Sequence, residues 1–139
     1  MTLYILDTDH VTLHQRNHPQ VIARIQKTIP EELATTVVTV EEQMRGRLAQ
    51  LNQSRINLSL AYEQLRATAN YFCDLTILPF DEAAQQQYQR LRSQKLRVGT
   101  LDLRIAAIAL TQNATIVTRN SRDFEHIPGL KIEDWSYLA

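Results

Sequence analysis

Four carboxylates stand where the sequence predicts that a strand ends or a helix begins: Asp7, Glu42, Asp102 and Asp123. Carboxylates held within a few ångströms repel each other, and they are tolerated together at neutral pH when protons or a cation lie among them. Hard divalent ions take oxygen ligands, and magnesium usually accepts one or two carboxylates and keeps several waters. If the four acids meet, they predict a Mg²⁺ or Mn²⁺ site that could activate water for phosphodiester hydrolysis.

The first acid follows a short apolar run, Leu3–Leu6, which reads as a buried strand. Ligands of an open α/β sheet collect at the carboxyl ends of its strands, beside the point where strand order reverses. We therefore treat Asp7 as the first residue of a site. The same reasoning expects further strands at residues 33–38, 75–78, 114–118 and 130–132.

Helices are expected between these strands. The apolar spacing, caps and breakers predict them over residues 10–17, 20–28, 39–50, 82–95 and 101–112, with a longer one from Asn52 or Ser54 to about residue 70. Strands that alternate with helices indicate an α/β fold, with a mainly parallel sheet and helices on both faces. At 139 residues and 44% hydrophobic content, residues 1–139 are expected to form a single domain.

Composition limits the classes of function. Cys73 is the single cysteine, which excludes an intrachain disulfide framework and a cysteine-rich zinc site and suits a reducing cytoplasm. The chain lacks a signal-peptide pattern, and its apolar runs fall short of the roughly 20 residues that a membrane span needs. Fifteen basic residues balance fifteen acidic ones, so nucleic-acid binding would depend on a local basic patch.

Each acid also has a structural interpretation. Glu42 stands three residues after Thr39, the spacing of a capping box. Asp102 could favour the positive end of a helix dipole, and Asp123 could form a turn. Asp7 is the hardest to explain in this way, because an acid directly after a buried strand has no capping role of its own.

Three further features bear on packing and on rival metal sites. Ile105, Ala106 and Ala109 share the helix face beside Asp102, which predicts tight packing on the sheet. Gly46, one turn after Glu42, predicts a close approach of two backbones. The pair His10 and His14 could bind a metal, but since no third ligand follows at a suitable spacing, we interpret the pair as an exposed helix face.

Taken together, these segments resemble the PIN-domain family, and within it the VapC-type toxins of type II toxin–antitoxin pairs. The resemblance runs through Leu6–Asp9, Thr39–Gly46, Gly99–Ala107, Val117–Phe124, Gly129–Leu130 and Glu133–Trp135. It implies a three-layer α/β/α fold and a Mg²⁺-dependent endoribonuclease, for which Mn²⁺ could substitute. It also implies inhibition by a cognate antitoxin protein and a homodimer.

The resemblance implies a metal centre formed by Asp7, Glu42 and Asp102 with a fourth polar or acidic residue. We assign Asp7 and Asp102 as metal ligands. Asp123 is our choice for the fourth acid, with Asn120 as a supporting ligand through water and Thr118 as a holder of water or phosphate. The family often has Asn where Asp9 stands, which adds a charge here. RNA phosphates need basic neighbours, for which the leading candidates are Arg97, Arg104 and Arg119.

Two rival functions remain. An Asp-x-Asp pair after a strand also fits a phosphatase of the haloacid dehalogenase type, with Asp7 as nucleophile. Such an enzyme needs a downstream lysine and an acidic pair, whereas Lys131 comes late and residues 118–123 offer one acid. The second rival is an inactive PIN-like binding module, which has no need to keep repulsive carboxylates together.

Overall fold

A computed structural model describes residues 1–53 and 55–137 of the protein. Within them, short parallel strands form one sheet in the order β3-β2-β1-β4-β5. The strands are β1 (Tyr4–Leu6), β2 (Leu33–Thr36), β3 (Thr76–Leu78), β4 (Thr115–Val117) and β5 (Lys131–Glu133). The chain builds the sheet outward from β1 to β3 and then crosses to the other side of β1. Strand order therefore reverses between β1 and β4, where open α/β sheets bind ligands.

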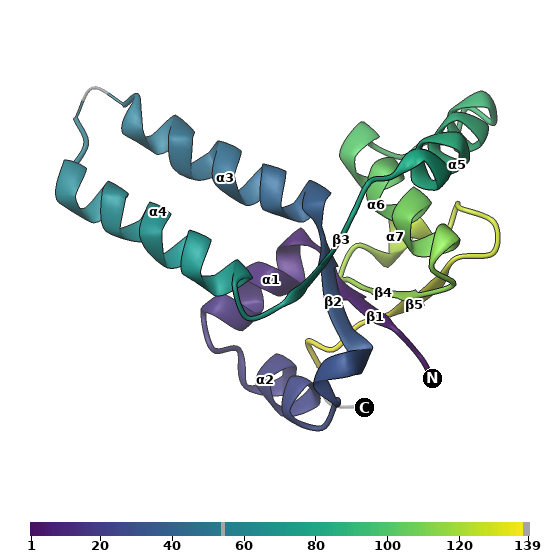
Figure 1. The fold of residues 1–139 in the computed structure, drawn as a ribbon, viewed down its shortest axis with the longest axis horizontal. Helices are drawn as coiled ribbons and strands as arrows, with labels where there is room; N and C mark the ends of the chain where they lie inside the picture. Colours follow the sequence, from purple (N-terminus) through teal and green to yellow (C-terminus); the bar gives the residue numbers. More distant parts are fainter. Residues whose placement is uncertain (54, 138–139) are drawn as a thin grey trace.

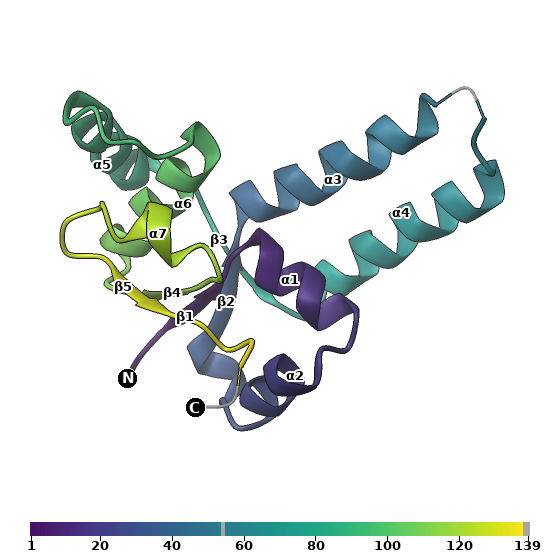
Figure 2. The ribbon, with the colours of Figure 1, turned by 180° about the vertical axis from the view of Figure 1, so that it is seen from behind.

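Helices cover both faces of this sheet, which confirms the expected three-layer α/β/α architecture (Figures 1 and 2). Figure 1 shows α3 and α4 as a packed antiparallel pair that extends away from the sheet, while α5 and α6 lie on the opposite side of the molecule. The helices are α1 (Thr8–Gln15), α2 (Pro19–Gln26), α3 (Val37–Leu51), α4 (Leu58–Phe72), α5 (Glu82–Ser93), α6 (Thr100–Thr111) and α7 (Ser121–Phe124), with a 3₁₀ turn at Pro30–Glu32.

Neighbouring residues of the central strands enter two different cores, as the alternation of side chains along a strand requires. On β1, Ile5 packs with the α5 and α6 side, whereas Leu6 packs with α1, α2 and α4. The chain end joins the second core through Trp135, whose side chain is fully buried. Both faces of the sheet are thus closed, and the strand ends are left to carry polar groups.

The predicted elements all exist, and their boundaries shift by a few residues. The largest differences concern α1, α3 and α4. Helix α1 begins at Thr8 rather than residue 10, and α3 begins at Val37 because Thr36, not Thr39, caps it. Helix α4 begins at Leu58 with Asn57 as its cap, later than Asn52. Ser54, the other predicted start, lies outside the described residues.

Packing predictions have mixed outcomes. The predicted inner face of α6 is confirmed, because Ile105, Ala106 and Ala109 are all buried. The prediction for Gly46 is wrong, since a Cβ built there would meet open space rather than a second backbone. Across residues 1–53 and 55–137, helices with the length and apolar content for crossing a bilayer are absent.

Candidate functional site

The four predicted acids meet at the carboxyl edge of the sheet. The environment of Asp102 in the first turn of α6 shows this, because Glu42, Asp7, Asp123 and also Asp9 act on it electrostatically. Burial raises the pKa of Asp102, and the charges of these neighbours raise it further, to about 6. A carboxylate that merely complemented the α6 dipole would have its charged form favoured. We call Asp7, Asp9, Glu42, Asp102 and Asp123 the acidic cluster.

Asp7 is fixed more firmly than the sequence suggested. It caps α1, with its Oδ1 atom accepting the backbone N–H of His10 at 3.0 Å, and the nearby Thr118 favours its charged form. The expectation that Asp7 has no capping role was wrong because α1 starts directly after it. The residue is 5% exposed, and burial raises its pKa. Asp7 is therefore a rigid, poorly hydrated carboxylate at the switch point of the sheet.

Glu42 is held by a neighbour that sequence reasoning did not assign. The hydroxyl of Thr8 donates to Glu42 Oε1 at 2.6 Å and lies 3.3 Å from the Thr39 hydroxyl. The capping-box interpretation of Glu42 does not apply, because the cap of α3 is Thr36, whose hydroxyl accepts the N–H of Thr39. The carboxylate of Glu42 is thus turned across to α1 rather than back to its own helix.

Asn120 links the two remaining acids. Its Nδ2 atom donates to Asp102 Oδ2 at 3.3 Å and to Asp123 Oδ2 at 3.0 Å. Its backbone N–H in turn donates to the Thr118 hydroxyl at 2.8 Å, and Thr118 is fully buried close to Asp7. Asn120 therefore connects the acids of α6 and α7, and Thr118 holds the backbone of Asn120 close to Asp7. The role of Thr118 in holding water or phosphate stays a prediction; in this structure its hydroxyl accepts the backbone N–H of Asn120.

His10 is not part of an exposed helix face, so that prediction was wrong. Its ring is fully buried, its Nδ1 atom lies 2.8 Å from Asp9 Oδ1, and its Nε2 atom accepts the backbone N–H of Trp135 at 3.2 Å. Burial lowers the pKa of His10, but hydrogen bonds to Asp7 and Asp9 outweigh it and raise the pKa to about 9. A pKa of about 9 alone would leave both ring nitrogens protonated at neutral pH. The backbone N–H of Trp135 points at Nε2, however, and a second proton there would break this hydrogen bond. The contacts in the structure are therefore those of the neutral ring, with its proton on Nδ1 toward Asp9.

This tautomer decides between two possible metal sites. Asp7, Asp9 and His10 place potential ligand atoms within 4.8 Å of one another. However, Nδ1 of His10 carries a proton toward Asp9, and Nε2 is already an acceptor for the main chain. His10 therefore orients Asp9 and anchors the chain end rather than offering a lone pair to a metal. His10 stands three residues after Asp7 at the start of a helix, and this spacing could have revealed the contact between His10 and Asp7.

The basic candidates lie in different surroundings. Arg119 is exposed and pairs with Asp9, with 3.4 Å between Nε and Oδ2. Arg104 lies over the ring of Tyr88, 5.3 Å from its centre, beside α5. Arg97 is exposed in the segment before α6. Of the three, Arg119 contacts the acidic cluster directly.

The acidic cluster fits a divalent cation by its donor chemistry. Its oxygens are hard ligands that come from β1, α1, α3, α6 and α7, and those of Asp102 and Asp123 share a single amide donor. Among the described residues, Arg119 is the one arginine or lysine that pairs with a member of the cluster. The neighbouring carboxylates disfavour the charged form of Asp102, and a cation among such acids would relieve this repulsion.

Comparisons with known proteins agree with this geometry. Ribonuclease VapC1 of Haemophilus influenzae (strain R2866) is 27% identical over 136 residues, covering 96% of this chain and 98% of that protein. The tRNA(fMet)-specific endonuclease VapC of Salmonella typhimurium is 27% identical over 139 residues, covering 97% and 99%. The chain is also similar to the crystal structure of DNA-bound VapBC from Salmonella typhimurium, with a TM-score of 0.82, 25% identity and coverage of 97% and 99%. A structure of VapBC-1 from nontypeable Haemophilus influenzae gives a TM-score of 0.79 at 27% identity, covering 98% and 100%.

Residues 4–130 match the PIN domain itself. This match spans β1 to β4 and ends just before β5, and it includes every member of the acidic cluster. The protein therefore belongs to the PIN domain family.

Proposed function

We propose that the protein is a metal-dependent endoribonuclease that hydrolyses RNA phosphodiester bonds at the acidic cluster. The single observation that carries this proposal is the arrangement of the acids at the switch point of the sheet, where the Asn120 amide donates to both Asp102 and Asp123 and the charges of Glu42 and Asp7 also act on Asp102. Curated relatives that cover nearly the whole chain are named as ribonucleases and as a tRNA endonuclease, which supports RNA as the substrate.

Asp7 and Asp102 are the proposed metal ligands, with Glu42 and Asp123 beside them. A bound Mg²⁺ or Mn²⁺ would lower the pKa of a water and stabilise charge on the departing oxygen. The residues of the chain supply the positioning: Thr8 aims Glu42, and Asn120 spaces Asp102 from Asp123. Arg119 is placed to meet a phosphate, because its exposed guanidinium already lies at the rim of the cluster.

The proposal includes a toxin role, with inhibition by a cognate antitoxin, a cytoplasmic location and a homodimer. Support comes from the structural neighbours, which are described as VapBC and as complexes of toxin with antitoxin. The Salmonella typhimurium VapBC structure is described as DNA-bound, and that of VapBC2 from Rickettsia felis as bound to a DNA fragment from the promoter. By analogy, the complex of this protein with its antitoxin would bind DNA, while the free protein would cut RNA.

The phosphatase alternative gains no support from the geometry. A nucleophilic Asp7 would need a lysine at the same edge of the sheet. Lys131 instead begins β5, and its Nζ atom donates to Asn113 Oδ1 at 3.2 Å, just before β4. That contact lies at the amino end of the parallel strands, opposite the acids.

The test is to purify the chain free of any antitoxin and to incubate it with total cellular RNA, with and without Mg²⁺, beside the Asp7→Asn variant. We expect cleavage that EDTA abolishes and that Asp7→Asn loses. Calorimetric titration of Mg²⁺ into the wild type should give a binding heat, and Asp7→Asn should lack it. An inactive binding module would show no such loss of heat in the variant. RNA cleavage by Asp7→Asn at the wild-type rate would refute the assignment of the site.

A further inference from the structure

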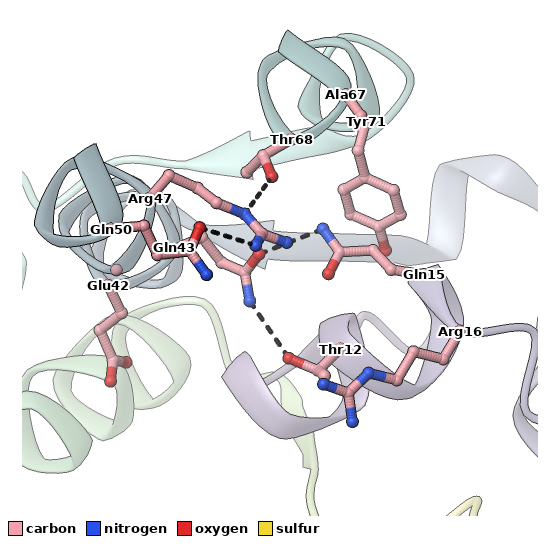
Figure 3. A pocket seen from close by; sticks show the side chains of 11 residues that line it. Thr12, Gln15, Arg16, Glu42, Gln43, Arg47, Gln50, Ala67, Thr68 and Tyr71 are labelled. Atoms are coloured by element: carbon pink, nitrogen blue, oxygen red, sulfur yellow. Dashed lines mark hydrogen bonds between the residues drawn. The ribbon is translucent and has the colours of Figure 1, made fainter. Parts of the chain in front are cut away.

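A polar cleft of about 570 Å³ opens between α1 and the α3–α4 pair (Figure 3). Figure 3 shows side chains that converge on it from all three helices: Gln15 and Arg16 from the end of α1, Gln43 and Arg47 from α3, and Tyr71 from α4. The volume falls within the range of about 300–1,000 Å³ that is usual for small-ligand sites. The cleft therefore has room for a ligand of nucleotide size.

The amides in this cleft are oriented by a chain of hydrogen bonds. The hydroxyl of Thr12 donates to the carbonyl of Thr8, Gln43 Nε2 donates to that hydroxyl at 3.1 Å, and Gln15 Nε2 donates to Gln43 Oε1 at 3.1 Å. Each amide has two N–H donors and an oxygen with two lone pairs. Gln15 and Gln43 thus keep both a donor and an acceptor for a ligand while their planes stay fixed.

The cleft also carries two arginines, Arg16 and Arg47, and one acid, Glu42, at its far end. Arg47 is partly buried, and it donates to the neutral oxygens of Thr68 and Gln50. Within residues 1–53 and 55–137, neither Arg47 nor Arg16 forms an ion pair with an acid. Arg16 is exposed. Both guanidinium groups thus keep donors for an anion, and phosphate is one that their fork of donors fits well.

Glu42 joins this cleft to the acidic cluster. It lines one end of the cleft, away from Tyr71 and Arg16 in Figure 3, and the hydroxyl of Thr8 holds its carboxylate. Thr8 and Thr12 are also linked through the hydrogen bond that begins the amide chain. A strand of RNA whose phosphate lies at the acids would therefore have its neighbouring nucleotide beside the cleft.

Building on the ribonuclease function proposed above, we propose that the cleft binds one unpaired nucleotide of the RNA next to the phosphate that is cut. The amides of Gln15 and Gln43 bond the edge of its base, Tyr71 forms an aromatic wall, and the arginines meet its phosphate. Such contacts require an unstacked base whose edge is exposed, so the substrate class is single-stranded RNA or a loop. A neutral peptide would leave the two guanidinium groups without partners.

The first test measures binding without cleavage. The Asp102→Asn protein, which should not cut, is titrated with a fluorescent single-stranded RNA of mixed sequence, and anisotropy is followed at several salt concentrations. Adding Arg16→Ala should weaken binding at least severalfold and should lower the salt slope by about 0.7, the effect of one phosphate contact on a single strand. The matched control is Arg66→Ala on α4, which removes an exposed arginine that pairs with Glu63 outside the cleft.

The second test measures base choice during cleavage. In the active protein, Gln15→Ala should reduce the preference for one base beside the cut by about fivefold or more, as expected for the loss of base-edge hydrogen bonds. Cutting itself should continue, because Gln15 does not touch the acidic cluster. Gln86→Ala, an exposed glutamine on α5, is the control and should keep the wild-type preference.

The outcomes separate this proposal from the ribonuclease proposal. If the protein cuts RNA but Arg16→Ala and Gln15→Ala behave as their controls, the nucleotide site is refuted while the nuclease stands. If RNA binding is unchanged but Arg16→Ala weakens the complex with a co-expressed antitoxin, the cleft belongs to the protein partner and the proposal is overturned. If the active protein cuts no RNA but binding still depends on Arg16, the nuclease fails and the nucleotide site is supported.

Discussion

Replacement of Asp102 by asparagine should stabilise the metal-free protein. The Asp102 pKa rises from 3.8 to about 6, so its charged form is disfavoured in the folded state. At about 1.4 kcal/mol per pKa unit, this rise corresponds to at most about 3 kcal/mol. Because the side chain is partly exposed, solvent screening reduces the expected gain to the order of 1 kcal/mol. Asparagine keeps the shape of the side chain and an oxygen for the Asn120 amide.

The dependence on pH has a definite sign. Between pH 3.8 and about 6, the folded protein keeps a proton on Asp102 that the unfolded chain has already released. The wild type therefore loses stability as pH rises through this window, and the loss is complete above it. The advantage of Asp102→Asn should be full at pH 7.5 and should disappear near pH 4.

Thermal unfolding followed by circular dichroism would measure both effects. In EDTA at pH 7.5, Asp102→Asn should melt about 3 to 5 °C above the wild type, as expected for 1 kcal/mol in a domain of this size. Adding Mg²⁺ should raise the melting temperature of the wild type by mass action and leave the variant nearly unchanged, since it lacks a ligand. A variant that melts lower in EDTA and still responds fully to Mg²⁺ would refute the reasoning. Glu63→Gln, on the exposed face of α4, is the control for removal of one charge.

Other substitutions test positioning and packing. Thr8→Val removes the donor that holds Glu42, so kcat for RNA cleavage should fall about tenfold or more with KM little changed, as for the loss of a hydrogen bond to a charged group. Ala106→Leu should overpack the fully buried contact of α6 with the sheet and cost about 1–3 kcal/mol in urea unfolding. His10→Ala should lower the free energy of unfolding by about 2–4 kcal/mol, because it opens a cavity and leaves the N–H of Trp135 without its acceptor.

Each of these has a control that isolates the physical cause. Thr8→Ser keeps the hydroxyl and should restore most of kcat; if it does not, the β-methyl group rather than the hydrogen bond is what matters. Ala83→Leu places the same extra volume on an exposed position of α5 and should cost little. His10→Gln offers a side-chain oxygen near the Trp135 N–H, so it should be less damaging than His10→Ala.

The edge of the sheet that carries the acids was predictable because parallel strands end on the same side. An acid after β1 and another after β4 must then face the same crevice, whatever the lengths of the intervening helices. Local capping was harder to predict. Thr36 and Thr39 are both competent caps, and only the strand pairing of Thr36 with Leu78 decides that the chain turns into helix directly after it.

The roles of Thr8 and His10 could not be read from the sequence for a different reason. Both act on residues far away in the chain: Thr8 on Glu42, and His10 on the main chain of Trp135. Neither contact follows a helical or strand period, so no local pattern signals it. Both contacts depend on α1 starting at Thr8. The predicted start at residue 10 gives Thr8 and His10 other positions in the helix, so it could not indicate either contact.

Several acids of the acidic cluster lie at helix N-termini, where the backbone dipoles favour negative charge. Asp7 caps α1, Asp9 lies in the first turn of α1, and Asp102 lies in the first turn of α6. Each helix N-terminus favours a carboxylate by about 0.3–1 kcal/mol. The pKa of Asp102 is nevertheless raised to about 6. Burial is the largest cause of this rise, and the charges of the neighbouring carboxylates add to it. Among the described residues, the five acids share one arginine partner, Arg119. The cluster therefore carries excess negative charge, which a divalent cation would balance while leaving room for a phosphate.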